Sequence, residues 1–128
     1  ERNAPLADLK PVVTRKQVIE ASKAVTGVKV SDDIKDYIVR IVSATRTSTK
    51  LLLGLSPRGS LALMRAARAY AAINGREYVI PSDVKKIAPN VTCHRVMLKG
   101  HSLSYGAKGT VDVINEILAT VPVPTEEV

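Results

Sequence analysis

The chain has 128 residues, which is enough for one domain whose core needs no disulfide or metal. Aromatic residues make up 3% of it, with no Trp or Phe, so Ala, Val, Leu and Ile must fill the core, which suits close-packed helices. The formal charge of +7 favours an anionic partner such as a nucleotide, a nucleic acid, an acidic protein or a membrane surface, although a solvated basic surface explains it equally well. The single Cys93 excludes an internal disulfide framework and fits a reducing compartment. No apolar run could span a bilayer, and no signal peptide is visible in residues 1–10, so we expect a cytoplasmic protein.

The first predicted helix follows an extended lead-in over residues 1–13, which contains two prolines. Thr14 and Gln17 form the pattern of a capping box at its start, and Gly27 ends it. Its spacing predicts a buried face, made of Val18, Ala21, Ser22 and Val25.

A second predicted helix begins after Ser31, which is a favoured N-cap residue. Two aspartates in its first turn suit the helix dipole. Its apolar stripe consists of Ile34, Tyr37, Ile38, Ile41 and Thr45. The polar residues 46–50 are expected to form a loop, and residues 51–53 are apolar.

A third helix is predicted over residues 57–73, with Asn74 and Gly75 as its stop signal. Ser56 is the expected N-cap residue, and Pro57 suits the first helical position. Arg58 then lies in the first turn, where the positive end of the helix dipole disfavours a cation by a few tenths of a kcal/mol. Arg58 should therefore point into solvent or face an anion.

The remaining elements are short. Residues 78–80 are extended, Pro81 starts a helix that Pro89 interrupts, and residues 99–109 form a loop. Thr110 is expected to cap a last helix. A very short strand at Val28–Val30 could pair with another at Val96–Leu98. The fold class predicted by this pattern is all-α, a small helical bundle with at most one tiny two-stranded sheet.

The third helix separates apolar from basic residues. At about 100° per residue, Leu63, Met64, Ala67, Tyr70 and Ala71 fall on one side. Arg58 and Arg65 nearly superimpose on the opposite side, Arg68 lies close to them, and no acidic residue occurs between Arg58 and Glu77. We predict a purely cationic face. It is either an ordinary solvated surface or a site for an anion.

Other chemistry has little support. Cys93, His94 and His101 are too few for a four-ligand zinc site, and no metal-binding residues are predicted. Cys93 is better explained as a small apolar residue in or near the core. A phosphate-binding loop needs a lysine where Ser60 stands, so this chain alone should not hydrolyse ATP.

Several linked motifs resemble the C-terminal lid of a MoxR-family AAA+ ATPase. They are Gly-Leu-Ser-Pro-Arg-Gly-Ser over residues 54–60, Gly-Arg-Glu-Tyr-Val-Ile-Pro-Ser-Asp-Val-Lys over residues 75–85, Ala-Pro-Asn-Val-Thr-Cys-His-Arg over residues 88–95, and the Val-Pro-Val-Pro tail. The resemblance covers most of the chain in order. It implies a lid over residues 14–124, a lead-in from an ATPase core over residues 1–13, and a tail over residues 125–128.

The resemblance also implies a function. Arg58 would be the sensor-2 arginine, the catalytic and nucleotide-binding residue of the lid, which acts on ATP held with Mg²⁺ by the core domain. Ser56, Pro57 and Arg65 would support it. The intact protein would be an ATP-hydrolysing, chaperone-like ring, expected to be a hexamer, with clients that carry von Willebrand factor A domains. No membrane span is implied.

An alternative from another class is a free-standing basic helical domain that binds nucleic acid. The charge and the arginine face permit it. The scarcity of aromatic residues and of Asn or Gln on the arginine helix argues against it.

Overall fold

The computed structural model of the chain describes residues 8–100 and 106–125. The predicted all-α fold class is confirmed. In chain order the elements are α1 (Arg15–Thr26), α2 (Asp32–Thr47), β1 (Leu51–Leu53), α3 (Pro57–Ile73), α4 (Pro81–Thr92), the 3-10 helix η2 (Cys93–Arg95), β2 (Met97–Leu98) and α5 (Gly106–Thr120).

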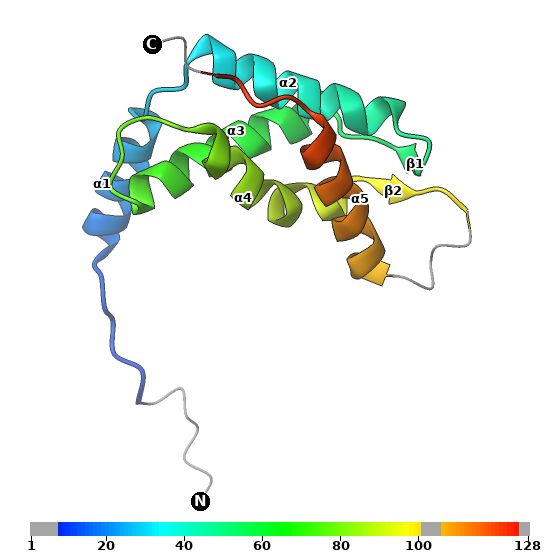
Figure 1. Ribbon diagram of the computed structural model, residues 1–128. Helices are drawn as coiled ribbons and strands as arrows, with labels where there is room; N and C mark the ends of the chain where they lie inside the picture. Colours follow the sequence, from blue (N-terminus) through cyan, green and yellow to red (C-terminus); the bar gives the residue numbers. More distant parts are fainter. Residues whose placement is uncertain (1–7, 101–105, 126–128) are drawn as a thin grey trace, which may run out of the picture.

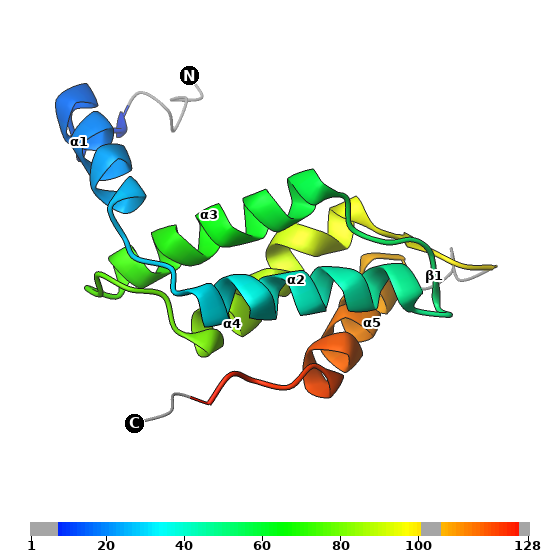
Figure 2. The same ribbon diagram turned by 90° about the horizontal axis from the view of Figure 1, so that it is seen from above.

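Helices α2 to α5 pack around one core, and α1 and the two strands lie at opposite ends of this body (Figures 1 and 2). α3 packs most extensively against α4 and also contacts α1 and α2. The largest fully buried apolar side chains are Tyr37, Ile41, Leu55, Leu63, Val84 and Ile114. The core is therefore almost wholly aliphatic, as the composition predicted.

The expectation that α1 buries one face is wrong. The capping box is present, with Thr14 Oγ1 accepting from the Gln17 N–H at 3.2 Å, but no residue of α1 is buried. Val18 is 52% exposed and Ile19 is 44% exposed. The helix lies at the end of the bundle and makes its main contact with α3 (Figure 2). Apolar side chains that its spacing places on one face are therefore largely exposed to solvent.

The predicted strand pairing is also wrong, although a two-stranded sheet exists. β2 pairs antiparallel with β1, with Leu51 opposite Leu98 and Leu53 opposite Met97. Lys29, in the segment expected to pair with Val96–Leu98, instead forms a parallel bridge with Tyr78. Short apolar runs look alike in a sequence, so their periodicity does not identify the partner strand.

Three helix boundaries differ from expectation. α2 continues to Thr47, so part of the expected loop over residues 46–50 is helical. α4 continues through Pro89, because its buried residues Val84, Ala88 and Thr92 anchor both sides of the proline. α5 begins at Gly106 rather than after Thr110, so Thr110 is not its cap.

The connection from α3 to α4 is held by an ion pair whose carboxylate is buried and whose arginine is partly exposed. Gly75 has φ +72°, a left-handed conformation that favours glycine. Arg76 then donates two hydrogen bonds of 2.5 Å to the carboxylate of Asp83, whose side chain is 2% exposed. The same carboxylate accepts the Ile80 N–H at 2.9 Å, at the start of α4. One carboxylate therefore fixes both the turn and the helix start.

The pKa of Asp83 makes this ion pair sensitive to acid. Burial alone would raise the pKa of Asp83, but the hydrogen bonds from Arg76 and the Ile80 N–H, with the Arg76 charge, outweigh it and lower the pKa below its usual value. The stabilisation is therefore complete above about pH 4 and is lost as the pH falls through the folded-state pKa. Asp83→Asn should lower the free energy of unfolding at pH 7 by about 2 kcal/mol, because it weakens the charge-assisted hydrogen bonds that the buried carboxylate accepts from Arg76 and the Ile80 N–H.

Urea denaturation at a series of pH values measures this effect. The variant should lose less stability than the wild type between pH 5 and 2 (about the range in which the carboxylate protonates). Asp112→Asn, at an exposed position of α5, is the matched control and should change little. Parallel acid profiles for Asp83→Asn and the wild type would contradict the assignment.

Tyr37 carries a buried hydroxyl that has no hydrogen-bond partner among the described residues. The residue is 1% exposed, and burial raises the pKa of Tyr37. Because an unpaired buried hydroxyl is destabilising, Tyr37→Phe should raise the free energy of unfolding by about 1 kcal/mol. Urea denaturation tests this, with Tyr78→Phe at an exposed position as the control. A loss of stability in Tyr37→Phe would show that the hydroxyl does have a partner.

Candidate functional site

The N-terminus of α3 carries an arginine and lacks the usual compensation for its dipole. α3 begins at Pro57, as predicted, and Ser56 has the extended backbone of an N-cap residue. Ser56 therefore occupies the predicted N-cap position, but its side chain makes no capping hydrogen bond. The first turn contains no acidic residue. Arg58 is exposed, and no ion pair of its guanidinium is found among the described residues.

A hollow lies beside this helix start. It is lined by Arg46 from the end of α2, Arg95 from η2, and residues 52–57, which join β1 to α3. Arg46 and Arg95 therefore line the same recess as Ser56 and Pro57, whereas Arg58 is not among its lining residues. The Nε atom of Arg95 donates to the Val91 carbonyl oxygen at 3.1 Å, and that of Arg46 donates to the Leu55 carbonyl oxygen at 2.7 Å. Such a recess, at the positive end of a 17-residue helix, is chemically suited to phosphate oxygens.

Sequence reasoning did not identify Arg46 or Arg95 as part of this site. Arg46 was expected in a loop, and Arg95 was noted only as the last residue of the motif over residues 88–95. Their positions in the sequence do not indicate that Arg46 and Arg95 line one recess. The fold brings them together, because the end of α2 and the 3-10 helix η2 both border the connection from β1 to α3.

The exposed face of α3 carries arginines, as predicted, but it also carries an apolar side chain. Arg65 is exposed, as predicted, two helical turns beyond Arg58 and about 10 Å along the axis. Leu61 lies between these arginines on the same side and is 49% exposed, which corrects the expectation of a purely basic face. Arg68 is half-buried, and its Nε atom is buried without a partner among the described residues. The opposite side packs into the core through Leu63, Ala67 and Ala71.

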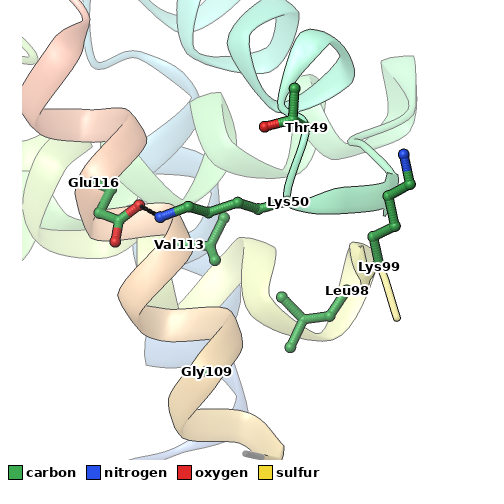
Figure 3. A pocket seen from close by; sticks show the side chains of 7 residues that line it. All are labelled: Thr49, Lys50, Leu98, Lys99, Gly109, Val113 and Glu116. Atoms are coloured by element: carbon green, nitrogen blue, oxygen red, sulfur yellow. Dashed lines mark hydrogen bonds and ion pairs between the residues drawn. The ribbon is translucent and has the colours of Figure 1, made fainter. Parts of the chain in front are cut away.

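A second hollow lies between the β1–β2 ribbon and α5 (Figure 3). Lys50 reaches across it to form an ion pair with Glu116 of α5, and Val113 lies beside the two side chains. Both charged side chains are more than half exposed, so the pair contributes at most about 1 kcal/mol to stability. The charge of Lys50 is thus already matched by a carboxylate, whereas Arg58 has no ion pair among the described residues.

Metal and thiol chemistry gain no support from the structure. Among the residues that the structure describes, no group of three or more His, Cys, Asp or Glu side chains could hold a metal ion. Cys93 is half-buried against the core, in line with its expected role, and burial raises the pKa of its thiol. His94 is exposed in η2, and His101 lies outside the described residues.

Comparison with known proteins shows the family to which this chain is related. Residues 43–117 match the AAA lid domain family. The chain is 40% identical to the uncharacterized protein YeaC of Bacillus subtilis over 126 residues, which cover 98% of this chain and 39% of YeaC. It is 41% identical over 98 residues to the chaperone MoxR1 of Mycobacterium tuberculosis, covering 70% of this chain and 26% of MoxR1. The chain thus spans well under half the length of these relatives.

A solved structure agrees with the sequence comparison. The crystal structure of a candidate ATPase from Cytophaga hutchinsonii superposes with a TM-score of 0.81 at 30% identity, over 91% of this chain and 38% of that one. The match covers nearly all of the helical body described above. The chain therefore belongs to the AAA lid domain family and is a lid domain of the MoxR type.

Proposed function

We propose that this chain is the sensor-2 lid of an ATP-hydrolysing AAA+ protein, and that Arg58 contacts the phosphates of ATP bound by a core domain. One observation carries the proposal. Arg58 is an exposed cation in the first turn of α3, with no acidic residue in that turn and no ion pair among the described residues. Family membership favours this function over a free-standing domain that binds nucleic acid.

The chemistry of phosphoryl transfer explains why an arginine is placed there. Catalysis of this reaction depends on positioning and on cations around the transferred phosphoryl group, rather than on covalent steps. A guanidinium offers a planar fork of donors that matches phosphate oxygens. The open N-terminus of α3 adds a favourable potential for the same anion. Ser56 and Pro57 would fix the helix start, and Arg65 would add to the positive potential.

A lid that carries such an arginine also responds to the nucleotide. The arginine gains or loses a contact according to which phosphates are present, so the favoured orientation of the lid depends on the state of ATP. In this proposal residues 14–124 form the lid, residues 1–13 are the lead-in from the core, and residues 125–128 are a tail. Residues 8–13 extend away from the helical body (Figure 1).

ATP and Mg²⁺ would be used by the intact protein. The recess at α3 fits phosphate, but the described residues offer no carboxylate cluster for Mg²⁺. The metal ligands would therefore lie outside the described part of this chain. The chain alone should bind nucleotide weakly, because most phosphate ligands would belong to the core.

The assembly proposed for the intact protein is a ring, with six subunits as the expected number. The lid would contact its own core and a neighbouring subunit, and the ring would act as a chaperone on clients that carry von Willebrand factor A domains. Support comes from the AAA lid membership and from similarity to the chaperone MoxR1. A cytoplasmic location is proposed on the same resemblance. Separately, none of the described helices has the length and apolar character needed to cross a bilayer.

Arg58→Ala in the full-length protein is the direct test. Loss of one arginine contact to the reacting phosphate should lower kcat for ATP by roughly 100-fold or more, as for other preorganised electrostatic groups. Arg58→Lys should recover only part of the rate, because lysine keeps the charge and loses the fork. Steady-state ATP hydrolysis measures both variants, and circular dichroism checks that the fold is intact.

Arg40→Ala is the matched control, since Arg40 is an exposed arginine of α2 outside the recess. Its turnover should equal that of the wild type. If Arg58→Ala turns over ATP as fast as this control, Arg58 has no sensor-2 role. Steeply salt-dependent binding of duplex DNA that Arg58→Ala and Arg65→Ala both weaken would instead support the nucleic-acid alternative.

A further inference from the structure

Leu55, three residues before Arg58, is held through both of its backbone polar groups by the last turn of α2. Its N–H donates to Thr45 Oγ1 at 3.0 Å, and its carbonyl oxygen accepts from Arg46 Nε at 2.7 Å. The Thr45 hydroxyl in turn donates to the Val42 carbonyl oxygen at 2.6 Å. Thr45 and Leu55 are each 1% exposed. We call this set of contacts from Thr45 and Arg46 to Leu55 the α2 clamp.

Glycine at position 54 lets the two segments approach this closely. A Cβ atom on Gly54 would lie 2.7 Å from the Cα and N atoms of Arg46 and from the carbonyl oxygen of Thr45. All three are backbone atoms, which cannot rotate away. On the other side, the Leu55 side chain meets the first turn of α3, where its Cδ2 atom lies 3.0 Å from the position of a Cβ on Gly59. Leu55 therefore joins the end of α2 to the start of α3.

The start of α3 depends on this connection because it has no side-chain cap of its own. Pro57 fixes one backbone dihedral angle, and the α2 clamp fixes the residue that precedes the N-cap. The direction in which the first turn presents Arg58 is therefore set by α2.

We infer that Arg46 is a positioning residue for Arg58, acting through the hydrogen bond from its Nε atom to the Leu55 carbonyl oxygen. The inference rests on the proposed function, because Arg58 matters for turnover only if it contacts nucleotide. In this role Arg46 acts through its Nε donor. The positive charge of Arg46, which also lines the recess, is not what this role requires.

Two substitutions separate the donor from the charge. In Arg46→Gln the side-chain amide nitrogen occupies the same place along the chain as the arginine Nε, so the donor is kept and the charge is lost. In Arg46→Lys a methylene group occupies that place, so the charge is kept and the donor is lost. A positioning role predicts that glutamine preserves function better than lysine. A direct phosphate contact by Arg46 predicts the reverse order.

Hydrogen exchange in the nucleotide-free, full-length protein tests the clamp without reference to catalysis. In peptides covering residues 52–60, Arg46→Lys should speed amide exchange by roughly three- to tenfold, the factor expected for one net hydrogen bond. Arg46→Gln should remain within about twofold of the wild type, and peptides from α4 should be unchanged in both variants. Unchanged exchange in Arg46→Lys, or equally fast exchange in Arg46→Gln, would overturn the inference.

ATP turnover of the same proteins tests the consequence. Arg46→Lys should lower kcat by roughly three- to tenfold, and by more than Arg46→Gln does. The double variant Arg46→Lys/Arg58→Ala should be no slower than Arg58→Ala alone, because Arg46 acts through Arg58. Additive losses, or a larger loss in Arg46→Gln than in Arg46→Lys, would show that Arg46 acts independently.

The two proposals fail in different ways. If Arg58→Ala is slow and Arg46→Lys is as fast as the wild type, the positioning role is wrong and the sensor-2 role stands. If Arg58→Ala turns over ATP normally, the sensor-2 role is wrong, and the part of the inference that concerns catalysis is wrong with it. Exchange at residues 52–60 then still decides whether Arg46 fixes the start of α3.

Discussion

The fold around the candidate site depends on one contact, the anchoring of the Leu55 backbone by the end of α2. Both backbone groups of Leu55 are committed to consecutive residues of that helix, Thr45 and Arg46. The Leu55 side chain is buried and belongs to the main core. A loop held in this way resists movement, because any displacement must break these two hydrogen bonds and expose an aliphatic side chain. The position of α3, and of every residue in its first turn, follows from this anchor.

Much of this could be predicted from the sequence because it is local. The bounds of α3, the capping box at Thr14 and the apolar stripe of α2 depend on residues within a few positions of one another, and each is confirmed. The partner of β2 and the exposure of α1 depend on which distant segments meet. Periodicity shows that a face is apolar, but it does not show whether another element covers that face. The same limit explains why Arg46 and Arg95 were missed, since the recess is made by segments from four separate elements.

The resemblance to MoxR-type lids predicted the fold and the family without revealing why the motifs are linked. The Thr-Arg pair at positions 45–46 and the Gly-Leu pair at positions 54–55 are separated by β1 in the sequence and look like independent features. In the structure they are the two sides of the α2 clamp, which requires a hydroxyl, an Nε donor and a missing Cβ at the same time. The sequence motifs alone do not show that these three features are needed together.

The weakly stabilised start of α3 is consistent with a site built for an anion that comes from elsewhere. A carboxylate in the first turn, or a capping side chain, would satisfy the helix dipole at a gain of about 0.5–1 kcal/mol. A carboxylate there would also neutralise Arg58 and occupy the space in which a phosphate could bind. The chain has neither, and the backbone of its first turn is instead positioned by Pro57 and by the α2 clamp, which add no negative charge to the recess. Stability and charge at this helix end are thus supplied by different groups, and the positive potential remains available to a ligand.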